Sequence, residues 1–332
     1  MADLHLTTRL TRRLGLTHPI LSAPMAGAAG GALAAAVTRA GGLGLLGGGY
    51  GDAGWIETER AAAGNAAIGI GFITWRLAGR EDLLTEALAH KPAALMLSFG
   101  DPAPYAALVH DADVPLIAQI QTLRDARHAA ASGASILVAQ GAEAGGHGQA
   151  RATMTLVPEV ADMLARDHPD TLLLAAGGIA DGRGLAAALM LGADGVLIGS
   201  RLWASAEAQV PSGLHLAALA ASGDDTLRSS VPDIARGLDW PDRYDIRTLR
   251  NAYTRRWAQD PEGQRAAMTA AGADEAARYA QAAQTGDATI APPVVGEAAG
   301  LIHDIRPAGQ IITDIAQQAT ALLSGGWRSQ DV

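Results

Sequence analysis

The sequence predicts an α/β fold, and within that class a (β/α)8 TIM barrel with a helical insertion between the eighth strand and the last helix. Short apolar runs alternate with Ala- and Leu-rich stretches along the chain, and eight such runs precede residue 200. The length of 332 residues also suits one barrel that carries an insertion. A doubly wound parallel sheet is the alternative, because it shows the same alternation.

The eight apolar runs are the expected strands. Most of them are continuously apolar rather than alternating, which is typical of parallel strands that are buried on both faces. The expected strands are Ile20–Ala23, Leu43–Leu46, Ala67–Ile73, Ala94–Ser98, Pro115–Gln119, Ser135–Ala139, Thr171–Ala176 and Gly195–Ile198.

The stretches between these runs are the expected helices, because apolar residues repeat three and four positions apart in several of them. Glycine marks most junctions between helix and strand, as at Gly41, Gly133 and Gly192. The clearest expected helices are Gly31–Ala40, Glu81–Ala89, Leu123–Ala131 and Gly184–Leu191.

The alternation of apolar runs and helical stretches stops after the eighth run. Residues 206–289 are polar, rich in Arg and Asp, and contain no run that predicts a strand. We expect this segment to be a helical insertion that covers the active site, while residues 1–205 and 290–325 form the barrel. An apolar stripe of helical spacing between Ile311 and Leu323 predicts the helix that closes the barrel. Several aromatic residues fall in the insertion, where packing between helices is the expected role and lining a substrate pocket is the alternative: Trp240, Tyr244, Tyr253, Trp257 and Tyr279.

Composition excludes several kinds of protein. The formal net charge is −9 and no Lys/Arg run occurs, which argues against nucleic acid as a partner. The chain has no cysteine, so disulfides, thiolate catalysis and Cys-ligated metals are excluded. The histidines show no metal-ligand spacing, and we expect no metal site. Lys91 is the only lysine, which makes a lysine Schiff base an unattractive mechanism.

The sequence also shows no membrane or export signal. No apolar run reaches the roughly 18 residues that a membrane span needs, and the N-terminus has no basic segment followed by an apolar one. We therefore expect a cytoplasmic protein without a membrane partner. A homodimer is compatible with the sequence, which leaves the oligomeric state open.

The most specific motif is a pair of glycine-rich turns after the seventh and eighth expected strands. Gly177 and Gly178 follow the seventh strand, and Gly199 and Ser200 follow the eighth. Barrels commonly bind phosphate at these two loops, where glycine lets backbone N–H groups approach an anion and a helix N-terminus favours negative charge. Tight turns that need glycine only for packing are the alternative. Two such turns in the expected places favour a phosphate site.

A second motif follows the sixth expected strand. The segment Gln140–Gly148 is rich in glycine, including Gly145 and Gly146, and presents His147 beside Glu143. A histidine on a loop at the active face of a barrel suits an acid/base or hydrogen-bonding role. A surface loop with an incidental histidine is the alternative.

Small or amide-bearing residues end three further strands. Ala23, Pro24 and Met25 end the first, Gly71 lies near the end of the third, and Gln119 ends the fifth. Small residues leave room for a flat ligand, and an amide can both donate and accept hydrogen bonds at its edge. The glycines between residues 41 and 49 lack the spacing of a dinucleotide-binding motif.

Taken in order, these segments resemble the FMN-dependent nitronate monooxygenase family, formerly called 2-nitropropane dioxygenases. The resemblance spans residues 19 to about 205 and a segment near the C-terminus. Its pieces are Pro19–Gly27, Ala40–Gly44, Gln140–His147, Ala175–Gly184, Leu191–Arg201 and Gly296–Ile302. Within this set, only the His147 loop and the double phosphate motif are specific when taken singly.

The resemblance implies a TIM barrel that holds FMN non-covalently, with residues 1–205 and 290–325 as the FMN-binding part. It implies that Gly177, Gly178, Gly199 and Ser200 bind the phosphate, and that His147 is the active-site histidine, which binds a nitronate or takes a proton from a nitroalkane. It further implies flavin contacts from the sixth-strand loop, the strand ends and the amide: Gly145, Gly146, Ala23, Pro24, Met25, Gly71 and Gln119.

Three positions depart from the family pattern. Gly71 stands where many relatives have an Asn that hydrogen-bonds the flavin, Ser200 stands where Thr is common, and Gly148-Gln149 follows His147 where Arg-Gly is frequent. These departures indicate a divergent subgroup and bear more on the substrate than on the cofactor.

The activity implied is oxidation of an alkyl nitronate, or of a nitroalkane, by O2 to a carbonyl compound and nitrite. An NAD(P)H-dependent FMN reductase acting on a quinone or an enoyl thioester is the first alternative, because the same barrel and a similar Gly-Gly-His loop serve such enzymes. A non-redox barrel that binds a phosphate-bearing ligand is the second.

Overall fold

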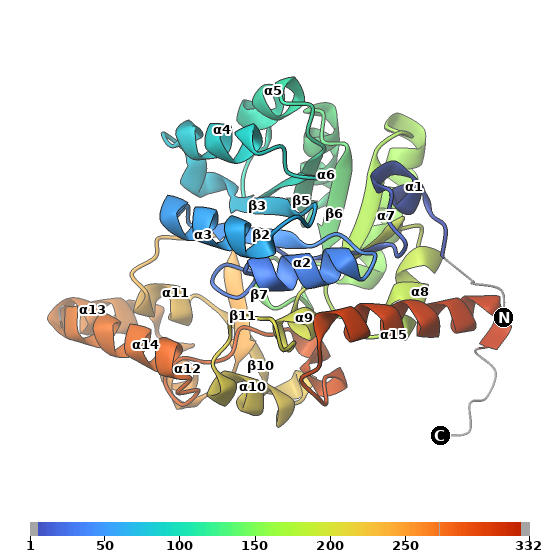
Figure 1. Ribbon diagram of the computed structural model, residues 1–332. Helices are drawn as coiled ribbons and strands as arrows, with labels where there is room; N and C mark the ends of the chain where they lie inside the picture. Colours follow the sequence, from blue (N-terminus) through green and yellow to red (C-terminus); the bar gives the residue numbers. More distant parts are fainter. Residues whose placement is uncertain (1–5, 272, 327–332) are drawn as a thin grey trace.

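The computed structural model describes residues 6–271 and 273–326, and its centre is a parallel eight-stranded sheet that closes on itself (Figure 1). The strand order is β1-β9-β8-β6-β5-β4-β3-β2. The two ends of this order meet at a bridge between Leu21 and Leu43, where the Ser22 N–H donates to the Leu43 carbonyl at 3.1 Å. The predicted (β/α)8 barrel is confirmed, and the doubly wound sheet is excluded.

Each of the eight predicted strands exists within a few residues of its expected bounds, and every strand residue of the barrel is buried apart from Gln119. The continuous apolar runs therefore reflect burial on both faces. The barrel strands are β1 (Ile20–Ser22), β2 (Leu45–Gly49), β3 (Gly69–Ile73), β4 (Leu95–Ser98), β5 (Leu116–Ile120), β6 (Ile136–Gln140), β8 (Leu172–Ala176) and β9 (Gly195–Ile198).

Helices surround this barrel, and side-chain oxygens begin several of them. Asp52, Thr122 and Asp181 each accept from the first-turn N–H groups of the helix that follows, which otherwise lack partners. The barrel helices are α1 (Arg9–Leu14), α2 (Gly31–Arg39), α3 (Ala53–Ala63), α4 (Glu81–Ala89), α5 (Ala103–Asp111), α6 (Leu123–Ala131), α7 (Thr153–Asp167), α8 (Gly182–Met190), α9 (Ser200–Trp203) and α15 (Ala308–Ala321). Short turns η1 (Thr74–Leu77), η3 (Glu297–Leu301) and η4 (Leu322–Gly326) complete this part.

Two apolar layers hold the barrel together. Side chains of alternate strand positions fill its interior, where Leu10 of α1 joins Met96 and Val138. The other positions face the helices and form the larger layer, which includes Leu33, Leu84 and many further residues.

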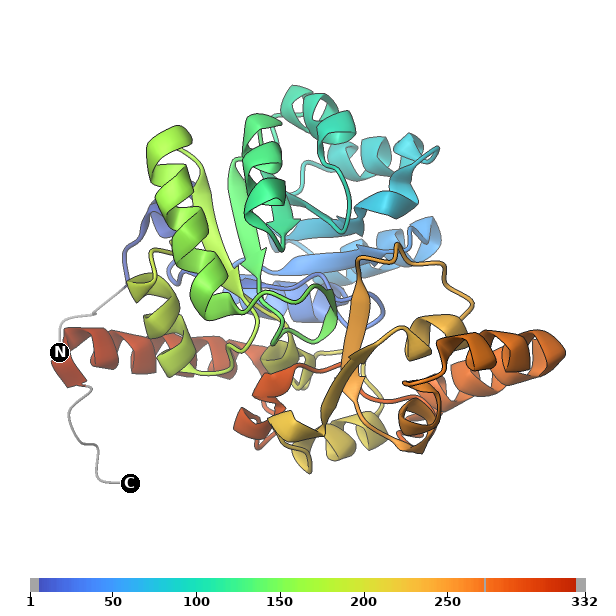
Figure 2. The same cartoon turned by 180° about the vertical axis from the view of Figure 1, so that it is seen from behind.

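The last helix closes the ring as predicted. α15 packs against α8 and α2, and its buried residues include Ile311, Ile312 and Ile315. Figures 1 and 2 show it as the long red helix beside α8.

Residues 206–289 form most of a second body, which we call the lobe and which lies against one end of the barrel (Figure 2). The expectation that this segment holds no strand is wrong. It contains β10 and β11, whose sequences are half-polar because one face of their small sheet stays accessible. The elements of the lobe are α10 (Ser212–Leu219), η2 (Gly223–Asp225), β10 (Thr226–Ser229), α11 (Val231–Ala235), β11 (Asp245–Leu249), α12 (Ala252–Trp257), α13 (Pro261–Ala271) and α14 (Ala273–Thr285).

The third strand of this small antiparallel sheet comes from the barrel. β7 (Gly146–Gly148) lies in the loop after β6 and pairs with β11, so the order is β10-β11-β7. The loop predicted to carry the active-site histidine is thus fixed to the lobe by backbone hydrogen bonds.

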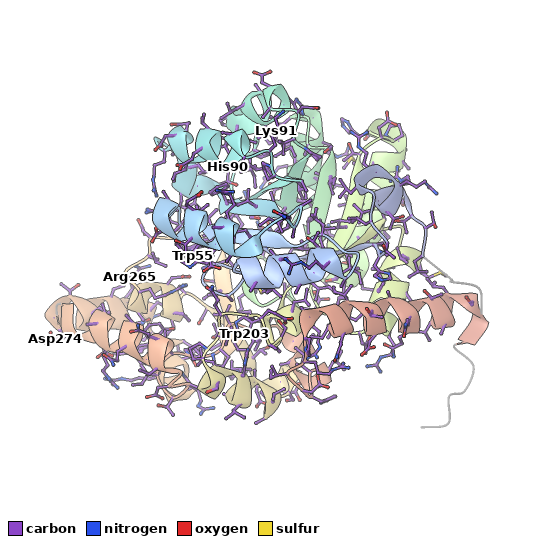
Figure 3. The ribbon with its side chains drawn as sticks, viewed as in Figure 1. Trp55, His90, Lys91, Trp203, Arg265 and Asp274 are labelled. Atoms are coloured by element: carbon purple, nitrogen blue, oxygen red, sulfur yellow. The ribbon has the colours of Figure 1, made fainter. Side chains whose placement is uncertain are left out.

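The only lysine of the chain lies far from this junction. Figure 3 labels Lys91 with His90 at the end of the molecule opposite the lobe, where the chain passes from α4 to β4. Lys91 therefore takes no part in the site described below.

Candidate active site

A cavity of about 560 Å³ lies where the carboxyl ends of the barrel strands meet the lobe. Residues at or just after the end of each of the eight barrel strands line it, from Ala23 after β1 to Gly199 after β9. The lobe contributes Arg236, Trp240 and Ile246 to the opposite wall. Active sites of this barrel fold occur at this face.

All of the residues predicted as site residues line this one cavity, although they come from strands and loops at the ends of six different barrel strands. They are Ala23, Pro24, Met25, Gly71, Gln119, Gly145, Gly146, His147, Gly177, Gly178, Gly199 and Ser200. Their individual roles stay predictions.

One end of the cavity is built for an anion. Gly177 and Gly178 have φ angles of 103° and 74°, which an L-residue adopts only with strain. Within the described residues, the N–H groups of Gly177, Gly178 and Gly199 donate to no protein acceptor. The Ser200 Oγ accepts from the Gly296 N–H at 2.9 Å, so its own hydrogen is free to donate. This cluster of unused donors suits a phosphate.

The wall beside this anion end is made of small residues. A Cβ on Gly71 would stand 2.4 Å from Pro24 Cγ, so no larger residue fits there unless Pro24 moves. The tight approach of β3 to Pro24 is therefore possible because Gly71 has no side chain. Ala23, Met25 and Gly199 also line the cavity, and the small size of Ala23 and Gly199 leaves room for a ligand.

Amide side chains form the floor of the cavity. The Gln119 Nε2–H donates to Gln140 Oε1 at 2.9 Å, and the Gln140 Nε2–H donates to the His147 carbonyl at 3.0 Å. Gln119 Oε1 has only a long contact of 3.5 Å with Ser98. Gln119 therefore keeps one N–H and most of its acceptor capacity for a ligand, as its predicted contact with a flavin edge requires.

His147 lies at the other end of the cavity, on β7. Its backbone pairs with Ile246 of β11, and its side chain is 8 % exposed. The imidazole Nε2 lies 2.9 and 3.0 Å from the two carboxylate oxygens of Asp233, on α11. Against an ionised carboxylate Nε2 carries the hydrogen and donates, which leaves the lone pair on Nδ1. No side chain in the described part of the protein hydrogen-bonds Nδ1, so it is the basic atom available to a ligand.

Burial lowers the pKa of His147 below its ordinary value, because the charged form loses its hydration. The hydrogen bond and the negative charge of Asp233 oppose this effect, while Arg236 and Arg228 add to it. The lowered pKa keeps His147 neutral at pH 7, and a neutral imidazole can accept a proton.

Aromatic side chains enclose His147. Trp240 stacks on the imidazole with ring centroids 3.4 Å apart and an interplanar angle of 9°. Phe99 approaches the imidazole edge-on at 5.9 Å and also contacts Trp240. Phe99 has a φ of 64°, an uncommon conformation for a bulky residue, and such strain often marks a functional site.

Two arginines of the lobe hold the glycine-rich loop. Arg228 donates to the carbonyls of Ala142, Ala144 and Gly146, and Arg247 donates to Ala142. Burial and the neighbouring Arg247 lower the Arg228 pKa to about 10, so the guanidinium stays charged at pH 7. The carbonyls of Ala142, Ala144 and Gly146 therefore face these two cations.

Sequence reasoning missed several cavity residues, because they lie far from any motif. Asp233, Arg236 and Trp240 come from the lobe and reach His147 only through the pairing of β7 with β11. Glu143, expected beside His147, instead accepts from the N–H and hydroxyl of Thr153 at the start of α7. Of the lobe aromatics, Tyr253 and Tyr279 pack within the lobe as expected, while Trp240 lines the cavity.

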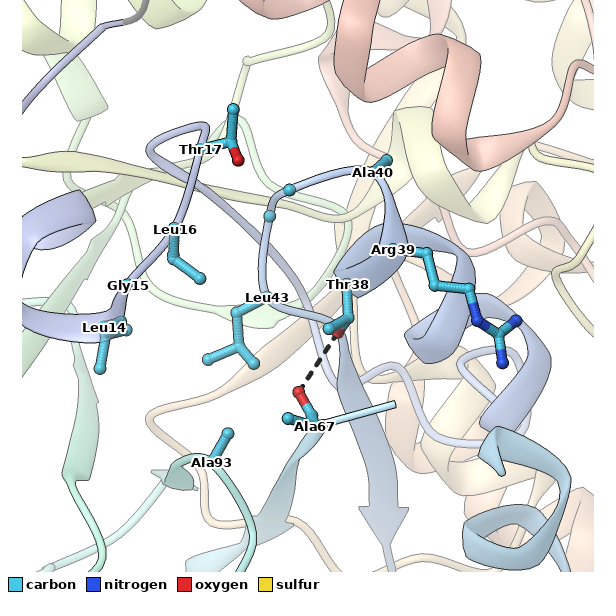
Figure 4. Close-up of a pocket in the computed structure, with 12 residues that line it drawn as sticks. Leu14, Gly15, Leu16, Thr17, Thr38, Arg39, Ala40, Leu43, Ala67 and Ala93 are labelled. Carbon is cyan, nitrogen blue, oxygen red and sulfur yellow. Dashed lines mark hydrogen bonds between the residues drawn. The ribbon is translucent and has the colours of Figure 1, made fainter. Parts of the chain in front are cut away.

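A second cavity of about 430 Å³ opens at the opposite face of the barrel. Figure 4 shows it between the turn at Gly15–Thr17 and the turn at Ala40–Leu43, with the Thr38 hydroxyl donating to the Ala67 carbonyl. Arg39 is the one charged side chain in its lining. The residues that line this second cavity include no histidine and no carboxylate, in contrast to the cavity that contains His147.

No helix within 6–271 and 273–326 is long and apolar enough to cross a membrane. In the same residues, no group of three or more His, Asp or Glu side chains is placed to hold a metal ion.

Comparisons with known proteins agree with this barrel and cavity. The family model for nitronate monooxygenase matches residues 80–318. A nitronate monooxygenase of Neurospora crassa is 34 % identical, with 90 % of this chain and 88 % of that protein covered. Nitronate monooxygenase npaC of Metarhizium robertsii is 36 % identical, with 92 % of each chain covered. The solved structure of FabK from Thermotoga maritima superposes with a TM-score of 0.82 at 29 % identity and covers 96 % of this chain and 98 % of that one.

The barrel fold and these comparisons together define a flavin-dependent oxidoreductase of the TIM-barrel class. Within that class, the chain belongs to the nitronate monooxygenase family.

Proposed function

We propose that the protein is an FMN-dependent nitronate monooxygenase, which oxidises alkyl nitronates with O2 to carbonyl compounds and nitrite. The observation that carries the proposal is that a basic imidazole nitrogen and a cluster of unused backbone donors lie at the two ends of one cavity. Two nitronate ions and one O2 balance two carbonyl molecules and two nitrite ions, so no further reductant is needed.

The residues present fit FMN. Gly177, Gly178, Gly199 and Ser200 would hold its phosphate, and Gln119 would contact the polar edge of its ring. Ala23, Pro24, Met25 and Gly71 form a wall that leaves room for the ring itself. Gly145 and Gly146 line the same cavity and would also contact the flavin. When bound, FMN supplies the electron-transfer chemistry that no side chain of this cavity offers.

His147 has the acid/base role in this proposal. Nδ1 accepts the α-proton of a nitroalkane, or faces a nitronate that is already deprotonated. Asp233 keeps the hydrogen on Nε2 and stabilises the imidazolium that forms when Nδ1 takes a proton. Trp240 and Phe99 keep bulk water from one face and one edge of the imidazole.

The proposal extends to the organisation and location of the chain. Residues 1–205 and 290–325 would be the FMN-binding barrel, and residues 206–289 the lobe that covers the site; the lobe side chains in the cavity wall support this division. A cytoplasmic location is supported by the lack of cysteine, and hence of disulfides.

The test uses the FMN-loaded protein without oxygen, mixed separately with propyl-2-nitronate and with NADH or NADPH while the flavin absorbance is followed. Rapid loss of the oxidised-flavin band with nitronate alone, followed by nitrite release when O2 is admitted, is the expected result. Bleaching by NADH or NADPH, with none by nitronate, would overturn the proposal and identify a reductase. A protein that takes up no FMN would indicate the non-redox alternative.

A further inference from the structure

At the lobe end of the cavity, two side chains carry hydrogen-bond donors that the protein leaves unused. Arg236 follows α11 and lines the cavity, and 31 % of its side chain is accessible. Its Nη2–H donates to Asp233 Oδ1 at 2.5 Å, and its Nε–H donates to the Pro232 carbonyl at 3.1 Å. The guanidinium also hydrogen-bonds the Tyr50 hydroxyl, and its remaining N–H groups are left for a ligand.

Tyr50 provides the second donor. Its hydroxyl oxygen accepts from the Trp240 Nε1–H at 3.1 Å, and no acceptor in the described residues receives its hydrogen. Burial raises the pKa of Tyr50, whereas the positive charge of Arg236 and the side-chain hydrogen bonds from Trp240 and Arg236 lower it. Arg80 fixes the backbone here, because it donates to the carbonyls of Tyr50 and Gly51.

The charges and walls around these donors define the group that would bind. Asp233 is already engaged by both His147 and Arg236, so its carboxylate is not a free acceptor for a substrate cation. The neighbouring walls are apolar and aromatic, formed by Phe72, Ile73, Phe99 and Trp240. A ligand that satisfies this end carries oxygen acceptors, preferably anionic, on a short apolar group.

We propose that Arg236 and Tyr50 bind the anionic head of the substrate, a planar group with two oxygen atoms, so that the site prefers nitronates and isosteric carboxylates to neutral nitroalkanes. A guanidinium matches two coplanar oxygens better than any other side chain, and the Tyr50 hydroxyl adds a third donor. The nitronate part of this inference rests on the proposed function, and the carboxylate part does not.

Binding without turnover gives the first test. Isobutyrate carries the charge, the planar two-oxygen head and the two methyl groups of propyl-2-nitronate on a tetrahedral α-carbon, and isobutyramide has nearly the same shape as isobutyrate without the charge. Calorimetric titration of the wild-type protein should show isobutyrate binding at least tenfold more tightly than isobutyramide. Arg236→Gln should remove this difference, because one charge-assisted contact is worth roughly 10- to 100-fold in affinity. Tyr50→Phe should weaken isobutyrate binding by a smaller factor.

Kinetics give the second test. Arg236→Gln should raise KM for propyl-2-nitronate roughly 10- to 100-fold, while KM for neutral 2-nitropropane changes by less than about threefold. Arg236→Lys keeps the charge and should retain part of the preference. Arg243→Gln is the matched control, because it removes a positive charge from the same lobe at a residue that pairs with Asp125 and does not line the cavity.

The outcomes separate this inference from the proposed function. Equal affinities for isobutyrate and isobutyramide in the wild type, or Arg236→Gln binding isobutyrate as tightly as the wild type does, would overturn the inference even if nitronate were oxidised. Arg236-dependent isobutyrate binding by a protein that does not oxidise nitronate would support the anion site and refute the function. Unchanged circular dichroism and FMN content of the variants exclude misfolding as the cause.

Discussion

At the scale of single residues, the site depends on one histidine whose two nitrogens have different partners. Asp233 takes Nε2 and leaves Nδ1 as the base, and the burial that lowers the His147 pKa keeps that base unprotonated. The histidine itself could be predicted from its glycine-rich loop. Asp233 could not, because a carboxylate 86 positions away in a segment without a motif gives no local signal.

Asp233→Asn should move the acid limb of the pH profile to lower pH. The carboxylate raises the His147 pKa, so its removal leaves the lowering effect of burial unopposed. The plateau of kcat/KM for a neutral nitroalkane should also fall, because a weaker base accepts the proton. The control is Asp101→Asn, which disrupts an exposed His–Asp pair of 2.7 Å at His128. A limb that stays in place or moves to higher pH would contradict the assignment.

Gly178→Asp should abolish FMN binding, because its carboxylate would meet the phosphate. The substitution also strains the backbone at φ 74°, so the control must carry the same strain. Gly79→Asp does so at φ 73°, with open space around its Cβ position. FMN content after gel filtration is the measurement. Equal flavin content in both variants would show that the phosphate binds elsewhere.

At the scale of elements, the barrel was predictable and the lobe was not. A parallel strand buried on both faces has an apolar signature of its own, and β4 or β8 shows it without its neighbours. β10 and β11 are half-buried, and β7 is the segment Gly146–Gly148, which no propensity marks as a strand. These three strands exist because they pair with one another across the boundary between barrel and lobe.

Arg228→Ala should loosen the loop that carries His147. The substitution leaves the carbonyls of Ala144 and Gly146 without their charged donor, while the Ala142 carbonyl keeps Arg247, and it should cost about 2 kcal/mol in the free energy of unfolding. Urea unfolding measures this cost, and hydrogen exchange should show faster exchange in β7. Arg255→Ala is the control, because Arg255 is exposed on α12 of the same lobe. Equal stability of the two variants would show that these hydrogen bonds do not hold the loop.

At the scale of the whole molecule, both the sheet of the barrel and the ring of helices around it are closed. The sheet closes at the bridge between Leu21 and Leu43, and α15 closes the ring of helices after the lobe has been completed. Both could be anticipated from sequence, the first from the count of eight strands and the second from the apolar stripe. The position of the lobe over the cavity follows from contacts between distant residues, and only the structure provides it.

Ile312→Ala should destabilise the whole molecule, because Ile312 is fully buried where α15 meets the barrel. The expected loss is about 2–5 kcal/mol in the free energy of unfolding, measured in urea. Leu323→Ala, just beyond α15 and 38 % exposed, should cost about 0.5 kcal/mol or less. A small loss at Ile312 would mean that the ring of helices is stable without tight packing of α15.

The pairing of β7 with β11 has a consequence for how such enzymes diversify. Because Asp233, Arg236 and Trp240 all come from one contiguous insertion, recombination between relatives at its two ends would exchange them as a unit. The anion end of the cavity lies on barrel loops and would pass through such an exchange intact. A chimaera that receives a foreign lobe should therefore keep its cofactor and inherit the donor's substrate preference, provided that the incoming strand still pairs with Gly146–Gly148.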